Sequence, residues 1–254
     1  MAGISDSNFI NKMIPYGFNM VTLGGYNTDK ETIEAGKEII KRGRKEFDVS
    51  EEDIYNHINS QVNNIKEFNG NNNCNENQNI FISANLRAIT PEPIIGISKI
   101  KNLDVVEINC HCRQEEIVNL NCGQGMLNDM DYLNDYISQV VKKSKSYVSV
   151  KIRANIDGID TIAISKMIDD VGADFLHIDL MKPGVGQPDL ELLKAIRNET
   201  NIFIIGNNMI QNVESANKMI AFGADGFSIA RGTLNGKLNF NLNQIKTKTF
   251  NKDI

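Results

Sequence analysis

Long hydrophobic runs, a basic leader and an excess of positive charge are all missing from this sequence. No stretch approaches the ~20 consecutive apolar residues that a membrane helix requires, and the start, MAGISDSNFI, lacks the basic and apolar segments of a secretory signal peptide. With 27 basic and 32 acidic side chains, the net charge of −5 argues against a nucleic-acid footprint along the whole chain, although it leaves a local basic patch open. We therefore expect a cytoplasmic protein without membrane contacts.

Cysteine and proline are also scarce, with four and five residues in 254. A hydrophobic content of 41% supplies a core and excludes a collagen-like, disordered or disulfide-scaffold protein. The length suits one large domain or two small ones. Because no linker interrupts the pattern, we predict a single domain over 1–254, with the asparagine-rich segment 69–79 as a flexible loop.

Seven apolar runs alternate with amphipathic helical patterns. The predicted strands are 18–23, 79–84, 104–109, 147–152, 174–179, 201–206 and 225–230. Their nearly continuous hydrophobicity is typical of parallel strands buried on both faces. Together with a missing or truncated strand near residue 1, they predict an α/β fold, a (βα)8 TIM barrel with a truncated first strand. The alternative is an open doubly wound sheet, but it predicts a Gly-x-Gly-x-x-Gly fingerprint after the first strand, which is absent.

The helical patterns carry recognisable end signals. Thr28 and Glu31 have the spacing of a capping box, and Ser50 suits the N-cap of the next helix. Later helices are predicted over 132–143, 159–170, 189–197 and 212–221. Gly172 and Gly223 each precede an Ala-Asp pair that leads into a strand, which suits a left-handed C-cap.

In a barrel, the chemistry lies at the carboxyl ends of the strands. Nearly every predicted strand ends in polar or small residues: Asn85, Arg87, 109–112, Lys151, Arg153, His177, Asp179, 206–208 and 230–232. We expect these side chains to meet at one mouth.

The last two strands end in Gly206-Asn207-Asn208 and in Ala230-Arg231-Gly232. Small residues, helix N-termini and an arginine predict a phosphate site there, the alternative being ordinary turns with an exposed arginine.

Lys151 and His177 are each open to two interpretations. Lys151 needs an anionic or electron-rich partner if it lies in the mouth, or else extends outward to solvent. His177 is either a satisfied core residue or a neighbour of the phosphate loops.

Three of the four cysteines, Cys110, Cys112 and Cys122, lie close together, with Cys74 distant. In a reducing compartment such a cluster is more often catalytic or metal-binding than disulfide-bonded. The C-x-C spacing differs from that of zinc ribbons, so we favour a thiol acid and expect no metal. If Cys112 points into the mouth, Cys110 points elsewhere.

Six segments match a known set of motifs in the same order. MAGISDSNF resembles M-A-G-V-T-D-x-x-F, EINCHC resembles D-I-N-x-G-C, VSVKIR resembles V-T-V-K-I-R, LHID resembles I-H-G-R, IIGNNMI resembles V-I-A-N-G-D-I, and GADGFSIARG resembles G-A-D-G-V-M-I-G-R-G. Each match is weak alone, but six in register are specific. By this pattern the chain resembles the tRNA-dihydrouridine synthase family, FMN-dependent TIM barrels related to dihydroorotate dehydrogenase.

The resemblance implies a flavoprotein oxidoreductase of tRNA processing that reduces a uracil-type C=C bond, with FMN as cofactor and NADPH or NADH as electron donor. Cys112 would be the general acid, and Asn109 would contact the substrate base. The cofactor residues, from the phosphate argument and the resemblance together, are Ala2, Gly3, Asn85, Lys151, His177, Gly206, Asn207, Asn208, Ala230 and Arg231.

The chain departs from the family pattern at several positions. His111-Cys112-Arg113 replaces Gly-Cys-Pro, Asn207-Asn208-Met209 replaces the Asn-Gly-Asp turn, and no counterpart of the family's C-terminal helical RNA-binding domain follows the last unit. The partner is therefore either tRNA or a small pyrimidine, as in a dihydroorotate-type dehydrogenase. Two other functions are compatible with the sequence: a phosphate-binding isomerase or lyase without flavin, and a non-catalytic binding protein. The sequence is also compatible with a homo-oligomer.

Overall fold

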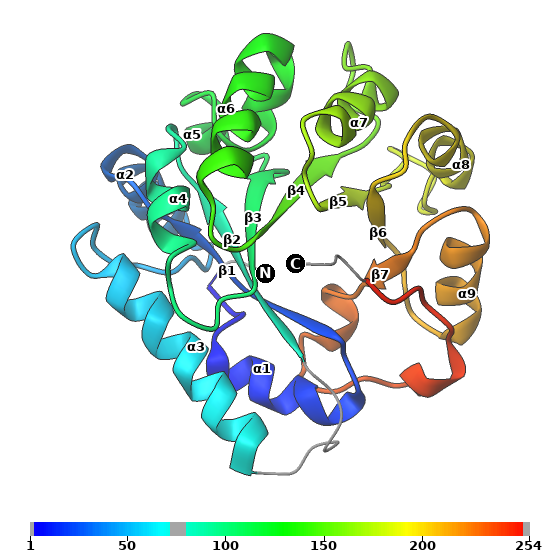
Figure 1. The fold of residues 1–254 in the computed structure, drawn as a ribbon, viewed down its shortest axis with the longest axis horizontal. Helices are drawn as coiled ribbons and strands as arrows, with labels where there is room; N and C mark the ends of the chain where they lie inside the picture. Colours follow the sequence, from blue (N-terminus) through cyan, green and yellow to red (C-terminus); the bar gives the residue numbers. More distant parts are fainter. Residues whose placement is uncertain (1–2, 72–79, 251–254) are drawn as a thin grey trace.

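The computed structural model describes residues 3–71 and 80–250. Seven parallel strands pair in chain order and curl around a common centre, with helices on the outside (Figure 1). They are β1 (Met20–Asn27), β2 (Phe81–Arg87), β3 (Val105–Cys110), β4 (Tyr147–Arg153), β5 (Phe175–Asp179), β6 (Phe203–Asn207) and β7 (Gly226–Ser228). All seven predicted strands are confirmed, and so is the α/β class with a parallel sheet.

The sheet is curled but open. Within the described residues no strand joins β7 to β1. Ser5 makes one isolated antiparallel bridge to Gly24, and α1 (Ser7–Met13) begins almost directly afterwards. The predicted truncated first strand is thus reduced here to a single bridge, and an eighth strand stays a prediction.

Helices follow the strands around the outside of the sheet. Besides α1 they are α2 (Lys30–Lys41), α3 (Ile54–Asn71), α4 (Glu92–Ile97), α5 (Glu115–Val118), α6 (Met130–Lys143), α7 (Thr161–Asp170), α8 (Leu190–Glu199) and α9 (Val213–Ala221), with short 3-10 turns η1 (Ile14–Tyr16), η2 (Gly123–Asn128), η3 (Arg231–Thr233) and η4 (Leu242–Gln244). None of these helices is both long and apolar enough to span a lipid bilayer.

The capping prediction for α2 was wrong by one residue. Asp29 is the N-cap, and its side chain accepts a hydrogen bond from the backbone of Thr32 at 3.0 Å. The hydroxyl of Thr28 instead donates to the carbonyl of Arg87 at 3.0 Å, which joins the ends of β1 and β2. A short aspartate at the cap and a threonine at N3 satisfy the same free N–H groups as the predicted pair.

The other predicted helix ends agree with the structure in part. Gly172 and Gly223 have φ of 82° and 113°, which confirms their left-handed conformation. The hydroxyl of Ser50 accepts a hydrogen bond from the backbone of Asp53 at 3.2 Å, but α3 itself starts only at Ile54. Because α3 runs to Asn71, the first residues of the predicted loop 69–79 are helical, and 72–79 lie outside the described residues.

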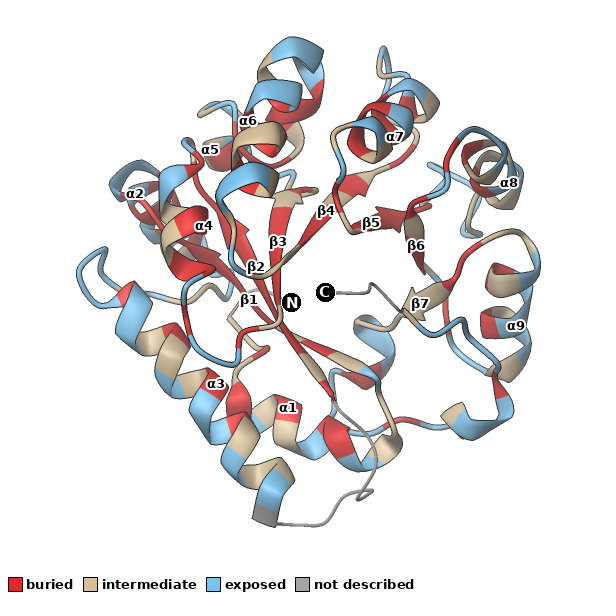
Figure 2. Ribbon diagram, viewed as in Figure 1, coloured by how far each residue is buried: buried red, intermediate tan, exposed pale blue. Residues whose placement is uncertain are grey.

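Alternating side chains divide each strand between two environments. Apolar residues such as Ile108 and Ile178 pack outward in the main core, while the outer surfaces of the helices are exposed (Figure 2). Inside the curl, the amino ends of the strands carry apolar and aromatic side chains: Phe81, Val105, Tyr147, Phe175, Phe203 and Ile205, joined by Phe250. This floor leaves the carboxyl ends as the polar end of the interior.

Candidate active site

A buried glutamate lies at the centre of the polar end. The parallel register aligns Glu107 of β3 with Asn85 of β2 and Ser149 of β4. Its carboxylate accepts hydrogen bonds from Asn85 Nδ2 at 2.7 Å, Ser149 Oγ at 3.1 Å and His177 Nδ1 at 2.7 Å. Burial alone would raise the pKa of Glu107, but the neighbouring His177, the charge of Lys151 and the hydrogen bonds from His177 and Asn85 outweigh burial and lower it.

His177 of β5 belongs to a directed chain of hydrogen bonds. Burial, followed by the charge of Lys151, lowers the pKa of His177, so the ring is neutral at pH 7. With its Nδ1–H donated to Glu107, its Nε2 accepts from the hydroxyl of Ser228 at 2.7 Å, and Ser228 Oγ accepts from Asn207 Nδ2 at 2.8 Å. Both ring nitrogens of His177 therefore have hydrogen-bond partners inside the protein. This agrees with the interpretation of His177 as a core residue whose polar atoms are all hydrogen-bonded.

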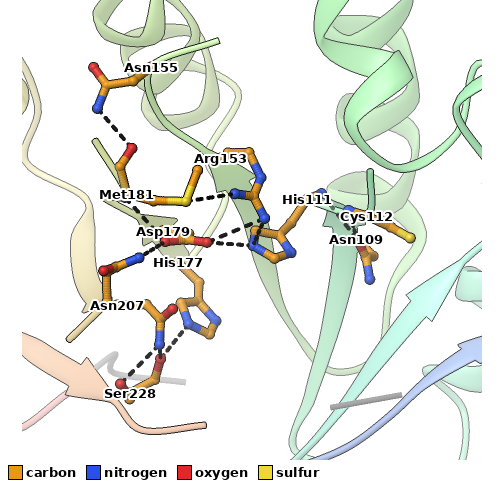
Figure 3. Close-up of polar contacts among 11 residues, drawn as sticks. Asn109, His111, Cys112, Arg153, Asn155, His177, Asp179, Met181, Asn207 and Ser228 are labelled. Atoms are coloured by element: carbon orange, nitrogen blue, oxygen red, sulfur yellow. Dashed lines mark hydrogen bonds and ion pairs between the residues drawn. The ribbon is translucent and has the colours of Figure 1, made fainter. Parts of the chain in front are cut away.

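Asn109 forms the turn that leaves β3. Its amide donates to Asn85 Oδ1 at 2.7 Å, and its Oδ1 accepts the backbone N–H groups of His111 at 3.0 Å and Cys112 at 2.9 Å. These bonds hold two side chains on opposite sides of the turn. Figure 3 shows His111 directed toward Arg153 and Asp179, and Cys112 directed away from them.

Cys112 lies beside a buried ion pair. Its Sγ is 3.5 Å from Arg87 Nη1, and Arg87 also pairs with Glu46 and donates to the carbonyl of Gly25 at 3.0 Å. The thiol is half-buried. Glu46 comes from the loop between α2 and α3, so that loop helps to build the mouth.

The other two described cysteines face the core. Cys110 is buried against Met126, with the two sulfur atoms 3.8 Å apart, and burial raises its pKa. Burial also raises the pKa of Cys122, to about 12. The expectation that Cys110 and Cys112 point in different directions is confirmed. Among residues 3–71 and 80–250, no group of three His, Cys, Asp or Glu side chains could hold a metal ion.

A second polar cluster lies at the rim, where β4, β5 and β6 end. Asp179 Oδ2 is 2.8 Å from His111 Nε2 and 3.5 Å from Arg153 Nη2, and its Oδ1 accepts from Asn208 Nδ2 at 2.7 Å. These donors outweigh burial and lower the pKa of Asp179. Burial, despite the hydrogen bond to Asp179, lowers the pKa of His111 to about 4.

Lys151 and Arg231 are cations at this end without an ion-pair partner in the described part of the chain. Lys151 is half-buried and aligns with Asn109 on one side and with His177 on the other, and its charge lowers the pKa of both Glu107 and His177. Arg231 is exposed at the start of η3. An unpaired lysine among amides and an unpaired arginine near a turn suit an anionic, electron-rich cofactor.

The remaining predicted cofactor residues lie at or after the ends of β6 and β7. Asn208 has φ of 118°, and Asn207 is tied to Ser228. Gly206 contributes packing, because a Cβ there would lie 2.5 Å from Met219 Sδ of α9. Ala230 precedes η3.

The N-terminal pair of predicted cofactor residues is only partly described. Gly3 has φ of 68°, and a Cβ there would lie 2.6 Å from the backbone of Lys45 and Glu46. Ala2 lies outside the described residues.

The sequence did not single out several residues that the structure places in these networks. Glu107 stands inside the run VVEIN, where a charged residue amid buried strand positions was an available signal. Ser149, Ser228 and Glu46 carry no local signal, because only the strand register and the loop after α2 bring them to the mouth.

The chain matches known proteins over most of its length. The family model described as dihydrouridine synthase matches residues 48–254. An uncharacterized protein of Methanocaldococcus jannaschii is 33% identical over 246 residues, which cover 94% of this chain and 88% of that protein.

More distant relatives carry functional names. A tRNA-dihydrouridine(16/17) synthase (NAD(P)+) of Saccharomyces cerevisiae is 26% identical over 62% of this chain and 40% of its own length. The catalytic subunit of dihydroorotate dehydrogenase B (NAD+) of Streptococcus pneumoniae is 27% identical over 55% of this chain and 50% of its own. The match to these two relatives thus spans half of their length or less.

Solved structures support the fold. A putative lyase/mutase from Burkholderia cenocepacia superimposes with a TM-score of 0.58 at 12% identity, covering 91% of this chain and 75% of the other. Identity at that level relates the two folds alone.

Proposed function

The chain belongs to the dihydrouridine synthase family, and from this membership we propose that it is an FMN-dependent oxidoreductase that reduces the C=C bond of a uracil-type ring. The observation that carries the proposal is the position of Lys151. It is a half-buried cation without an ion-pair partner in the described residues, and it lies between Asn109 and His177 at the mouth. Such a cation stabilises negative charge on a bound ring.

The residues present fit FMN, and each would contribute in its own way. Lys151 would hold the electron-rich edge of the ring, and Asn85 would lie under it. Arg231 and the turn of Asn207 and Asn208 would hold the phosphate. His177 would support this region through Ser228 and Asn207. FMN, when bound, supplies the hydride chemistry.

The protein's own chemical contribution is the placement of a proton. Cys112 Sγ is the proposed acid that protonates a ring carbon of the substrate. Asn109 holds the Cys112 backbone N–H at 2.9 Å, and Arg87 holds the thiol at 3.5 Å. Because Arg87 is itself fixed by Glu46, the thiol has a defined position.

A flavin titration tests the proposal. Purified protein should gain flavin absorbance and quench FMN fluorescence at micromolar FMN. Lys151→Ala should weaken FMN binding at least ~10-fold, because it removes the charge at the ring edge. Lys143→Ala, on the exposed end of α6, is the matched control and should bind as the unchanged protein does. Absence of binding, or equal effects of the two substitutions, would contradict the proposal and favour an isomerase, a lyase or a binding protein.

The electron donor and the substrate are separate parts of the proposal. We expect NADPH or NADH to bleach the bound flavin without oxygen, and the faster nucleotide identifies the donor. The net charge of −5 favours a small pyrimidine over tRNA. Retention of tRNA at low salt that weakens steeply with added salt would reverse this preference.

A further inference from the structure

The rim cluster around Asp179 contains two departures from the family motifs. His111 stands where the motif D-I-N-x-G-C has glycine, and Asp179 stands where I-H-G-R has arginine. The two substituted residues contact each other, with His111 Nε2 at 2.8 Å from Asp179 Oδ2. The two departures from the motifs therefore meet in one contact.

The surroundings of Asp179 fix which histidine nitrogen carries the proton. Asn208 Nδ2 and the backbone N–H of Met181 donate to Oδ1 at 2.7 and 3.2 Å, so the carboxylate is ionised and acts only as an acceptor. His111 Nε2 faces two groups of opposite demand: Asp179 Oδ2, an acceptor, at 2.8 Å and Arg153 Nη2, a donor, at 3.0 Å. We assign the proton to Nε2, because the carboxylate is the closer of the two and a lone pair on Nε2 would face its negative charge.

The other nitrogen of His111 is left with a free lone pair. The pKa of His111, lowered to about 4 chiefly by burial, keeps the ring neutral at pH 7, so a proton on Nε2 leaves none on Nδ1. Nδ1 has no hydrogen-bond partner in the described part of the chain, and the side chain is 26% exposed.

His111, which carries this free lone pair on Nδ1, lies in the same turn as Asn109 and Cys112, the residues proposed to act on the substrate. The ring lies between the Arg153–Asp179 pair and Asn109 (Figure 3), and the two nitrogens of an imidazole diverge, so Nδ1 faces away from Asp179. The backbone N–H of His111 is held by Asn109 Oδ1 at 3.0 Å.

We propose that His111 is a specificity-determining residue whose Nδ1 accepts a hydrogen bond from the imide N–H of a uracil-type ring. Asp179 acts as its positioning residue, because it holds the ring in the tautomer with an acceptor on Nδ1. A carbonyl oxygen at the same place would meet a lone pair and be disfavoured. This inference rests on the proposed function and adds to it the polarity that the substrate must present.

Nitrogen NMR of the protein labelled with 15N-histidine tests the tautomer, and the sequence contains only three histidines. His111→Gln assigns the His111 signals by their loss. In the flavin-free protein, His111 should be the Nε2–H tautomer. In Asp179→Asn the amide can donate to Nε2, so His111 should shift toward the Nδ1–H tautomer. An Nδ1–H tautomer in the unchanged protein would overturn the inference, whether or not FMN binds.

Ligand preference tests the role. The probes are 1-methyluracil, which has the imide N–H, and 1,3-dimethyluracil, which lacks it, both titrated into FMN-loaded protein and followed by flavin absorbance. We expect 1-methyluracil to bind about 10-fold more tightly. His111→Phe should abolish this preference, and His111→Gln, which keeps an acceptor, should retain part of it. Equal binding of the two probes, or a preference unchanged in His111→Phe, would overturn the inference while leaving the flavin result intact. Failure of FMN binding would instead overturn the proposed function, and the tautomer would still decide the polarity of His111.

Discussion

At the scale of single residues, the polar mouth is built from pairs that lie far apart in the sequence. The inward positions of the strands were predictable, since polar residues end almost every apolar run. Their partners were not: Glu107 pairs with His177 over 70 residues, and Arg87 pairs with Glu46 over 41 residues. Local pattern shows that a residue is polar and near a strand end, whereas the partner depends on the register and the curl of the sheet.

Cys112 offers the most direct prediction at this scale. Cys112→Ala should lower the rate of substrate reduction by about 10²–10⁴-fold, the range for loss of a general acid. Bleaching of bound flavin by NADPH or NADH should be unchanged, since that step does not use the thiol. Stopped-flow absorbance separates the two steps.

Cys110→Ala is the matched control for this experiment, because Cys110 is buried against Met126 on the other face of β3. It should reduce stability and leave the rate per folded molecule intact. Loss of flavin bleaching in Cys112→Ala would assign the thiol a structural role.

Glu107→Gln should change how stability depends on pH. The folded pKa of Glu107 is lowered, so its stabilisation is fully present above the unfolded value of about 4.3 and is lost progressively as the pH falls from there through the lower folded pKa. The substitution should lower the free energy of unfolding by about 2 kcal/mol at pH 7, because it weakens the charged hydrogen bonds to His177 and Ser149. The difference from the unchanged protein should shrink on acidification, as measured by urea unfolding at several pH values.

Glu34→Gln serves as the control for this pH series. Glu34 also has a lowered pKa, from its hydrogen bond to Lys37, but its side chain is exposed at 62%. Solvent screens such a pair, so this variant should follow the stability curve of the unchanged protein. A Glu107→Gln curve parallel to it at every pH would contradict the assigned ionisation.

At the scale of elements, sequence periodicity located all the strands of residues 3–71 and 80–250 but not all of their helices. The α1 and α4 helices are seven and six residues long, too short for an amphipathic period to stand out, and neither was predicted. The α2 cap differed by one residue because Thr28 bonds to β2, a neighbour that the local sequence does not reveal. Boundaries set by tertiary contacts are therefore the part of an element that local pattern specifies least.

The 3-10 turn η2 supports the loop of Cys112 and yields a prediction at this scale. Gly123 has φ of 58°, and a Cβ there would lie 2.6 Å from the carbonyl oxygen of Cys112. Gly123→Ala should therefore cost about 1–3 kcal/mol in unfolding free energy, through strain and displacement of the Cys112 backbone, and should slow substrate reduction. Urea unfolding and steady-state rates measure the two effects.

Gly158→Ala isolates the strain from the contact, because Gly158 has φ of 78° and no neighbouring group lies within 4 Å of the place that a Cβ would occupy. It should cost about 1 kcal/mol and leave the rate unchanged. Equal loss of activity in the two variants would mean that the close approach to Cys112 does not matter for the reaction.

At the scale of the whole molecule, the interior of the curled sheet is divided into an aromatic floor and a polar mouth. The floor depends on the far end of the chain: the ring of Phe250 lies 4.3 Å from that of Phe175, 5.1 Å from Tyr147 and 5.6 Å from Phe203, centroid to centroid. No local pattern predicts this docking, because Phe250 follows a polar segment without strand or helix periodicity. The topology alone brings the last described residue under the amino ends of β2, β4, β5 and β6.

This division predicts that stability and ligand binding can be changed separately. Phe250→Ala should lower the free energy of unfolding by about 2–3 kcal/mol, because the ring is half-buried among four aromatic side chains. The affinity for FMN should stay within about 2-fold, since the proposed site lies at the opposite ends of the strands. Lys246→Ala, an exposed change in the same segment, is the control and should alter neither quantity. A parallel loss of flavin affinity and stability in Phe250→Ala would show that floor and mouth act as one unit, whereas unchanged stability would mean that the terminal ring does not contribute to the core.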